Sequence, residues 1–180
     1  SFHRAFDRIH ERLMRSGIRT VFTACPNCTK IFRQYGQGLT VHTVYEYLAG
    51  KTPTSRPVAA GPITIHDPCA LRDDLPSQQA VRRLLGDLGY SFKEMDHSGR
   101  RTLCCGEGGS IAAVSPRRAE EWTNLCGGEA SGRRVVTYCA GCAGRLGRKR
   151  PAVHLADLLA FQDAAGKGVP KAARAPFTYW

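Results

Sequence analysis

The sequence predicts an α/β fold of mainly parallel strands with flanking helices, and two observations carry this prediction. Short β-branched runs alternate with longer segments whose apolar residues recur at helical spacing, which is typical of α/β domains. Part of the chain also repeats, which indicates two pseudo-repeated halves. The 180 residues, with an apolar content of 42%, are enough to bury one good core or two small ones.

The first half is expected to open with a helix over residues 2–16 that ends at Gly17. The apolar residues that share one face of this helix are Phe2, Phe6, Ile9 and Leu13. A short β-rich run follows at residues 21–24. The stretch 50–62 is rich in Pro, Gly, Thr and Ser, which indicates a linker between the halves.

The second half is expected to alternate strands and helices. Strands are predicted at residues 63–66, 90–95 and 135–138. Helices are predicted at residues 77–88, from about residue 110, and at 116–126. Ser77 is the expected N-cap of the first helix, and Pro116 suits the first turn of the last one. Because ligands of α/β sheets gather at the carboxyl ends of the strands, a site is expected at that edge.

An internal repeat relates the two halves. Residues 20–28 align with residues 134–142 at an offset of 114 residues, and each copy places a CxxC motif after a β-rich run. In both copies a Val-His pair follows further on: Val41-His42 and Val153-His154. We therefore divide the chain into residues 1–60, the C-terminal part of a first unit, and residues 61–180, a complete second unit.

Five of the eight cysteines form one pattern, spaced C-x34-CC-x33-CxxC. They are Cys69, Cys104, Cys105, Cys139 and Cys142. The adjacent pair is a poor disulfide, because neighbouring Cα atoms lie about 3.8 Å apart and disulfides usually span roughly 4.4–6.8 Å. Adjacent thiolates can instead reach two iron atoms of one cluster. The pattern therefore favours multi-thiolate iron–sulfur ligation over a set of unligated reduced cysteines.

These cysteines and the residues around them resemble the cysteine-rich CCG domain. The matching words are His66-Asp67-Pro68-Cys69, Cys104-Cys105-Gly106-Glu107-Gly108-Gly109 and Thr137-Tyr138-Cys139-Ala140-Gly141-Cys142. This domain occurs in the B and D subunits of heterodisulfide reductases and in the iron–sulfur subunits of glycolate, lactate and anaerobic glycerol-3-phosphate dehydrogenases. The resemblance covers about residues 18–162. It implies that the five cysteines hold a [4Fe-4S] cluster, noncubane in the best-studied relatives, with an ordinary four-cysteine cubane as the alternative.

The repeat gives Cys25 and Cys28 the place of the last two cysteines of a preceding CCG motif. Residues 1–24 contain no cysteine, so the other ligands of that motif would lie upstream in a longer chain, unless the first motif is degenerate. We therefore expect Cys25 and Cys28 to bind metal only together with upstream residues, and a second cluster only in a longer chain.

Residues close to the cysteine words are candidates for supporting roles. Gly106 would let backbone N–H groups approach the cluster sulfurs, although a plain turn glycine is the alternative. His66 precedes Cys69 closely enough to support a ligand or donate a proton, and a hydrogen-bonded strand-end histidine is its alternative. Glu107 is a candidate proton relay or arginine partner, so His66 and Glu107 are the candidate catalytic residues. Cys126 lies outside the motif and is expected to be a small buried residue.

The net charge of +11 is large, and arginines cluster at residues 100–101, 117–118, 133–134 and 145–150. Three interpretations are open: a solvated basic surface, compensation for an anionic thiolate cluster, and docking of an acidic electron carrier. Nucleic acid is not expected as a partner, since no helix-turn-helix, RNP or finger signature accompanies the charge.

The cysteine usage and the absence of targeting segments bear on location. The sequence shows no signal peptide and no apolar run of roughly 18 residues, so no membrane span is expected in this chain. Clustered cysteines favour metal binding in a reducing compartment. We therefore expect a cytoplasmic protein, and peripheral association with the cytoplasmic face of a membrane fits the same observations.

The expected function is that of an iron–sulfur oxidoreductase or electron-transfer subunit, similar to heterodisulfide reductase, that passes electrons to a disulfide or a quinone-linked acceptor. Its redox partner would be a flavoprotein or ferredoxin-type subunit, and a small disulfide would be the substrate in the reductase-like version. No G-x-G-x-x-G fingerprint and no C-x2-C-x2-C-x3-C-P run is present, so neither nucleotide binding nor a ferredoxin-type cluster is expected in this chain. The alternative is a zinc-binding structural module that uses the two CxxC pairs, which would leave Cys69, Cys104 and Cys105 without a role.

Overall fold

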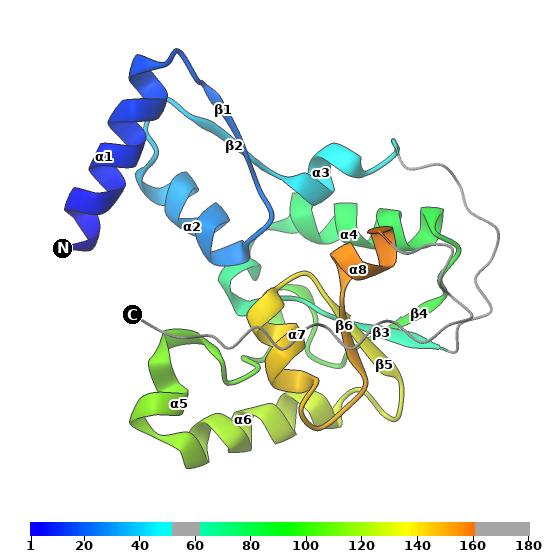
Figure 1. The fold of residues 1–180 in the computed structure, drawn as a ribbon. Helices are drawn as coiled ribbons and strands as arrows, with labels where there is room; N and C mark the ends of the chain where they lie inside the picture. The colour runs from blue at the N-terminus through cyan, green and yellow to red at the C-terminus, as the bar shows by residue number, and fades with distance from the viewer. Residues whose placement is uncertain (52–61, 161–180) are drawn as a thin grey trace.

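The computed structural model describes residues 1–51 and 62–160 of the chain (Figure 1). Within these residues lie a two-stranded and a four-stranded β-sheet, and every strand pairing in them is parallel. Helices flank both sheets, so the predicted α/β fold with parallel strands is confirmed. Most of the predicted linker, residues 52–61, lies outside the described residues.

The first sheet is built into a succession of helix, strand, helix, strand and helix. Its elements are α1 (Phe2–Arg15), β1 (Thr20–Thr23), α2 (Pro26–Tyr35), β2 (Thr40–Thr43) and α3 (Val44–Leu48). On the predicted apolar face of α1, Phe6 is buried and its ring packs against Phe32, with centroids 5.3 Å apart. Phe2 and Ile9 of the same face stay exposed. The helix is therefore anchored on α2 mainly through Phe6.

The second sheet has the strand order β4-β3-β5-β6. Its strands are β3 (Ile63–His66), β4 (Phe92–Glu94), β5 (Arg134–Thr137) and β6 (Ala152–His154). β3 lies inside the sheet and is buried along its full length, as expected for a central parallel strand that is covered on both faces. The three strands predicted in this half all coincide with observed strands, and their ends differ by at most two residues.

Helices surround the second sheet and connect its strands. They are η1 (Cys69–Leu71), α4 (Leu75–Asp87), η2 (Gly99–Arg101), η3 (Gly108–Ser110), α5 (Ile111–Val114), α6 (Pro116–Gly128), α7 (Ala140–Leu146) and α8 (Leu155–Ala160). The prediction that Ser77 caps α4 is wrong. Asp74 is the N-cap, and its carboxylate accepts a hydrogen bond from the Ser77 backbone N–H. A carboxylate at this position satisfies a helix N–H that has no partner within the helix.

The internal repeat is present in the fold. The succession β1-α2-β2-α3 has the same element order as β5-α7-β6-α8, and in each the two strands pair in parallel. The fold therefore contains the two pseudo-repeated halves that the sequence indicates. The division between residues 60 and 61 falls outside the described residues and stays a prediction.

The two halves contact each other through α2, α3 and the start of α4. Tyr45 of α3 is buried, and its ring packs against that of Tyr138, with centroids 5.7 Å apart. Arg33 of α2 forms ion pairs with Glu46 and Asp74. In Figure 1, α1 lies at one end of the molecule and α6 at the other, and the contacts between the halves lie between them. The carboxyl ends of β1 and β5 are thereby brought into the same central region.

Candidate metal centre

The five motif cysteines come together at the carboxyl edge of the second sheet. Cys69 follows β3 and begins η1. Cys139 follows β5 and is the N-cap of α7, which also carries Cys142. The pair Cys104-Cys105 lies in the loop between η2 and η3. All five are free thiols, and they lie at the edge of the sheet where the sequence predicts a site.

The five sulfur atoms form one continuous run of contacts. The Sγ atoms of Cys105 and Cys142 lie 3.2 Å apart. Cys104 is hydrogen-bonded to Cys69 and to Cys105, and Cys139 is hydrogen-bonded to Cys142. Cys105 and Cys142 are buried, whereas the other three are partly exposed. The set therefore has a buried side and an open side.

Crowding displaces the pKa values of these thiols in opposite directions. Hydrogen bonds from Cys105 and Cys69 lower the pKa of Cys104 to about 2. The same contacts raise the pKa of Cys105 to about 12 and that of Cys69 still further. A hydrogen bond from Cys142 lowers the pKa of Cys139 to about 6. Since thiolates at contact distance repel one another, all five can be ionised together only around bound cations.

Backbone N–H groups after the CC pair point at the sulfur of Cys104. The Gly106 nitrogen lies 3.3 Å from Cys104 Sγ, and Gly108 also donates to it. Gly106 has a φ of +86°, and a Cβ at this position would clash with the carbonyl oxygen of Ala119. Glycine is therefore required for this donor geometry. The expected approach of the Gly106 N–H to a sulfur is present, and a role in holding a cofactor stays a proposal.

His66 ends β3 on the buried side of the cysteine set. A ring nitrogen of His66 and the sulfurs of Cys105 and Cys142 lie within 4.8 Å of one another. Burial lowers the pKa of His66 to about 4, so the imidazole is neutral near pH 7. Its Nδ1 lies 3.4 Å from the Sγ of Cys126, and its Nε2 has no hydrogen-bond partner among the described residues. Cys126 is buried as expected, but its contact with His66 was not predicted from the sequence.

Asp67, the residue after β3, fixes the loop that carries the CC pair. Its buried carboxylate accepts hydrogen bonds from Arg82 at 3.1 and 2.8 Å, from Tyr138 at 2.9 Å and from the Gly99 N–H at 2.8 Å. The Thr102 hydroxyl donates to the Asp67 carbonyl oxygen at 2.6 Å. Burial opposes ionisation, but the hydrogen bonds and charge of Arg82 lower the pKa of Asp67. Sequence reasoning missed these positioning residues, and the only signal for them was the place of Asp67 in the His-Asp-Pro-Cys word.

Comparison with known proteins identifies the region around this site. Residues 63–147 match the family described as the CCG cysteine-rich domain. The chain contains a CCG domain. This domain runs from the first residue of β3 to the residue after α7 and includes all five motif cysteines. The resemblance found in the cysteine words is confirmed.

Two curated relatives match a little over half of the chain. A probable membrane-anchored ferredoxin from Chromohalobacter salexigens is 32% identical over 101 residues, which cover 54% of this chain and 15% of the relative. The D subunit of a dihydromethanophenazine:CoB–CoM heterodisulfide reductase from Methanosarcina barkeri is 31% identical over 119 residues, which cover 59% of this chain and 29% of the relative. The chain thus spans less than a third of either relative. Within residues 1–51 and 62–160, no helix is both long and apolar enough to cross a bilayer.

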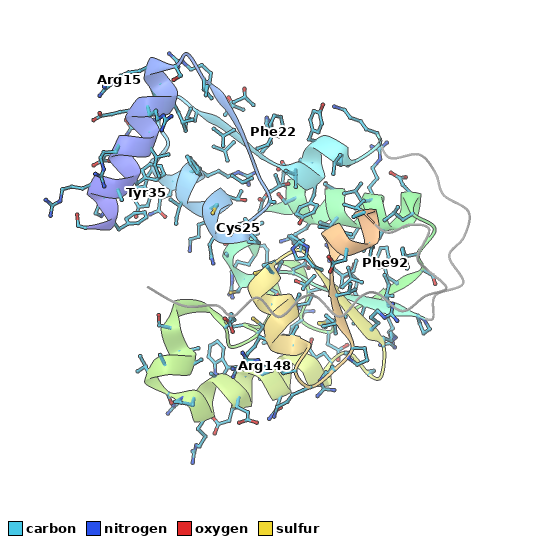
Figure 2. The ribbon with its side chains drawn as sticks, in the orientation of Figure 1. Arg15, Phe22, Cys25, Tyr35, Phe92 and Arg148 are labelled. Atoms are coloured by element: carbon cyan, nitrogen blue, oxygen red, sulfur yellow. The ribbon has the colours of Figure 1, made fainter. Side chains whose placement is uncertain are left out.

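Cys25 and Cys28 do not take part in the sulfur contacts of the CCG domain described above. Cys25 is the N-cap of α2 at the end of β1 (Figure 2), and both thiols are exposed. Burial, followed by a hydrogen bond with Cys25, raises the pKa of Cys28. Burial raises the pKa of Tyr45 to about 12, and the charges of Cys139 and Cys25 contribute to the same shift. The two CxxC motifs therefore approach one buried tyrosine from the two halves.

Glu107 lies beside the CxxC turn of the CCG domain. Its Cγ atom would lie 3.0 Å from a Cβ placed on Gly141, and its charge opposes the lowering of the Cys139 pKa. No ion pair joins Glu107 to a basic side chain within the part of the chain that the structure describes, so the expected arginine pairing is not found there. A role as proton relay stays a proposal.

A basic patch lies between α6 and the end of α7 of the CCG domain, where Figure 2 shows Arg148. The patch forms a hollow of about 150 Å³ that is lined by Glu120, Thr123, Arg145, Arg148 and Lys149. Arg145 donates a hydrogen bond of 2.9 Å to the Thr123 hydroxyl. The same hydroxyl lies 2.8 Å from the carbonyl oxygen of Cys105. Two hydrogen bonds therefore link the basic patch to the backbone of a motif cysteine.

Proposed function

We propose that this chain is an iron–sulfur subunit of an oxidoreductase, similar to heterodisulfide reductase, that binds one [4Fe-4S] cluster through its five motif cysteines. The proposed ligands are Cys69, Cys104, Cys105, Cys139 and Cys142. The observation that carries the proposal is the continuous run of contacts among five sulfurs, which includes the 3.2 Å approach of Cys105 to Cys142. Iron–sulfur clusters are held by thiolates, whereas a structural zinc site takes only about four ligands.

The groups around the sulfurs suit an anionic cluster. Gly106 and Gly108 direct backbone N–H groups at the sulfur of Cys104, and His66 has a buried nitrogen without a hydrogen-bond partner among the described residues. Hydrogen bonds to cluster sulfurs offset negative charge and tune the reduction potential. Five thiolates suit a noncubane cluster, which we favour, and ligation of a cubane by four of them is the alternative.

The two sides of the cysteine set suit different tasks. When bound, the cluster supplies one-electron transfer. Burial of Cys105 and Cys142 keeps water from one side, and the partly exposed thiols leave the other side open. A small disulfide, in a reductase-like reaction, or a quinone-linked carrier, in a dehydrogenase-like one, would approach from the open side. Glu107 is the proposed proton relay beside Cys139, and His66 supports the ligands from the buried side.

A redox partner, either a flavoprotein or a ferredoxin-type subunit, docks on the basic patch in this proposal. Arg145 and Arg148 offer positive charge to an acidic surface, whereas Lys149 is ion-paired with Glu120. Thr123 links the patch to the Cys105 backbone. The names of the two relatives, a ferredoxin and a heterodisulfide reductase subunit, support a role in electron transfer. The proposed location is the cytoplasm, at the membrane face where the acceptor is quinone-linked.

In this proposal the chain consists of two CCG-type units, of which the first is partial. Residues 1–60 would be the C-terminal part of a first CCG-type unit, and residues 61–180 a complete cluster-binding unit. Cys25 and Cys28 would then hold a second cluster only together with upstream residues of a longer chain. The common β-α-β-α order of the two halves supports this division.

A zinc-binding structural module that joins the two CxxC pairs is the second candidate. The contacts of Cys142 disfavour it. Its sulfur lies 3.2 Å from that of Cys105. Cys28 is hydrogen-bonded to Cys25. A single zinc ion would therefore need the two pairs to move together.

Anaerobic purification followed by metal and sulfide analysis tests the proposal against this candidate. The cluster proposal predicts brown protein that contains iron and acid-labile sulfide in equal amounts. Colourless protein that contains zinc and no sulfide would show that the structural module is correct.

A further inference from the structure

Cys126 and His66 form a buried polar pair behind the five motif cysteines. Cys126, on α6, and His66, at the end of β3, are each 1% exposed. The Cys126 Sγ lies 3.4 Å from His66 Nδ1. The second ring nitrogen, Nε2, is buried and has no hydrogen-bond partner within the described part of the chain. Since buried polar atoms are rarely left without a partner, Nε2 is expected to have a hydrogen-bond partner beside it.

The sulfurs of Cys105 and Cys142 are the candidate partners of Nε2. A ring nitrogen of His66 lies within 4.8 Å of both sulfurs, and Nδ1 is already in contact with Cys126. A neutral imidazole carries a proton on one nitrogen and a lone pair on the other, so the bond made by Nδ1 decides what Nε2 can do. If the thiol donates to Nδ1, Nε2 carries the proton. If Nδ1 donates to the thiol, Nε2 presents a lone pair.

The charge of the proposed cluster selects between these arrangements. Cluster sulfurs accept hydrogen bonds, and a lone pair directed at them would be repelled. Burial also raises the pKa of the Cys126 thiol to about 12, so this thiol keeps the proton that it donates. The charge of the proposed cluster and the raised pKa of Cys126 both favour a donor thiol and a protonated Nε2.

We propose that Cys126 is a positioning residue whose thiol donates to His66 Nδ1 and thereby directs the Nε2 proton at the sulfurs of Cys105 and Cys142. This inference rests on the proposed function, because the sulfurs of a cluster site are the acceptors of that proton. It gives a role to a cysteine outside the motif and distinguishes it from the ligands. Cys126 acts on the cluster only through His66.

The reduction potential reports this arrangement. A hydrogen bond to a cluster sulfur stabilises the reduced state, which carries more negative charge, and so raises the potential. Loss of the thiol donor releases Nδ1 to take the imidazole proton and removes the donor at Nε2. The potential is therefore expected to fall when Cys126 is changed, although its side chain does not bind iron.

The test is a reduction-potential titration of the full 180-residue chain with its cluster, in a matched set of variants. Cys126→Ala and Cys126→Val remove the donor, and valine preserves more of the buried volume. Cys126→Ser keeps a hydroxyl donor, and His66→Phe removes the ring nitrogens. We expect a lower potential in Cys126→Ala, Cys126→Val and His66→Phe, and a potential close to the parent in Cys126→Ser. Cys126→Ala should add no further shift in a His66→Phe background.

Electron paramagnetic resonance gives a second readout that does not depend on activity. In protein labelled with nitrogen-15 histidine, the reduced cluster should show coupling to a histidine nitrogen. The coupling should disappear in His66→Phe and weaken in Cys126→Ala, and it should persist in Cys126→Ser.

The outcomes separate the failure of this inference from the failure of the proposed function. Unchanged or higher potentials in the non-donor variants, with iron and sulfide retained, would overturn the inference and leave the function intact. Equal shifts in Cys126→Ser and Cys126→Ala would also overturn it, since the proton of the thiol would then not matter. Loss of iron in Cys126→Ser would indicate that Cys126 is a cluster ligand, and this would contradict its positioning role. A parent protein without iron would defeat the proposed function and the inference together.

Discussion

The two copies of the β-α-β-α unit share their local structure and differ in the environment of their cysteines. Cys25 and Cys139 each follow a strand, adopt an extended backbone and cap the next helix. In the first copy both thiols of the CxxC motif are exposed, whereas in the second Cys139 is partly exposed and Cys142 is buried. The difference arises outside the motif. β5 pairs with β3 as well as β6, and among the described strands β1 pairs only with β2.

This comparison shows which level of structure determines the chemistry. A strand followed by CxxC is enough to build the turn and the start of the helix, so both copies have them. The thiol environment depends on three neighbours that the described part of the first copy lacks: the end of β3, the loop with the CC pair, and α6 with Cys126. A CxxC pair therefore becomes part of a candidate metal site only where the fold brings these neighbours to it.

Loss of single motif cysteines should have the largest effect. Replacing any one of Cys104, Cys105, Cys139 or Cys142 with serine should lower the iron and sulfide content severalfold, because each sulfur belongs to one continuous set. Iron and sulfide analysis of each variant purified anaerobically is the measurement. Cys126→Ser is the matched control and should keep its iron. Unchanged iron in all four variants would refute the ligand set.

The Asp67 network should dominate the stability of the second half. Asp67→Ala removes the partner of buried hydrogen bonds from Arg82 and Tyr138 and should cost about 3–5 kcal/mol in the free energy of unfolding. Urea unfolding of the cluster-free chain measures it. Glu11→Ala, which removes the exposed ion pair with Arg15 on α1, should cost only about 0.3–0.5 kcal/mol. Equal losses of unfolding free energy in the two variants would mean that the Asp67 hydrogen bonds do not hold the loop that carries the CC pair.

Gly106 should tolerate a side chain less well than a glycine of the first half with a similar backbone. Gly17 has a φ of +73° and open space around it, so Gly17→Ala should cost about 1–2 kcal/mol from backbone strain alone. Gly106→Ala adds a clash with the Ala119 carbonyl oxygen, which should cost about 1–3 kcal/mol more. Urea unfolding compares the two variants, and equal costs would show that the CC loop can shift without loss.

Removing the charge of the basic patch should have the smallest effect. It should change the rate of electron transfer and leave the cluster unchanged. Replacing Arg145 and Arg148 of the patch, together with the neighbouring Arg150, by glutamine should slow reduction by an acidic partner severalfold and weaken its salt dependence, since charges near the surface are screened over about 8 Å at physiological ionic strength. Stopped-flow reduction over a range of salt concentrations is the measurement.

Two controls show whether this effect comes from docking. The same change at three exposed arginines of α1 in the first half, Arg4, Arg8 and Arg12, should leave the rate nearly unchanged. Reduction by a small neutral reagent should also be insensitive to salt. If the neutral reagent responds to salt as strongly as the partner, the charges act on the cluster itself and the docking interpretation fails.

Sequence patterns predicted the elements of the fold well because these depend on neighbouring residues. The strand over residues 63–66 was predicted at its observed bounds, and the repeat placed both CxxC turns correctly. The cap of α4 was misplaced because Asp74 and Ser77 are both good capping residues within one turn. Patterns could not give the contact of His66 with Cys126, 60 residues away, or that of Asp67 with Tyr138, 71 residues away. Such contacts depend on how β3, α6 and β5 pack together.

The central claim is that the second copy alone carries the complete site in this chain. Iron and acid-labile sulfide per chain, measured after anaerobic reconstitution of two double variants and the parent, test it most directly. The account predicts one cluster per chain in the parent and in Cys25→Ser/Cys28→Ser, and almost none in Cys139→Ser/Cys142→Ser. Two clusters per chain in the parent, or loss of iron when only the first CxxC motif is removed, would contradict it.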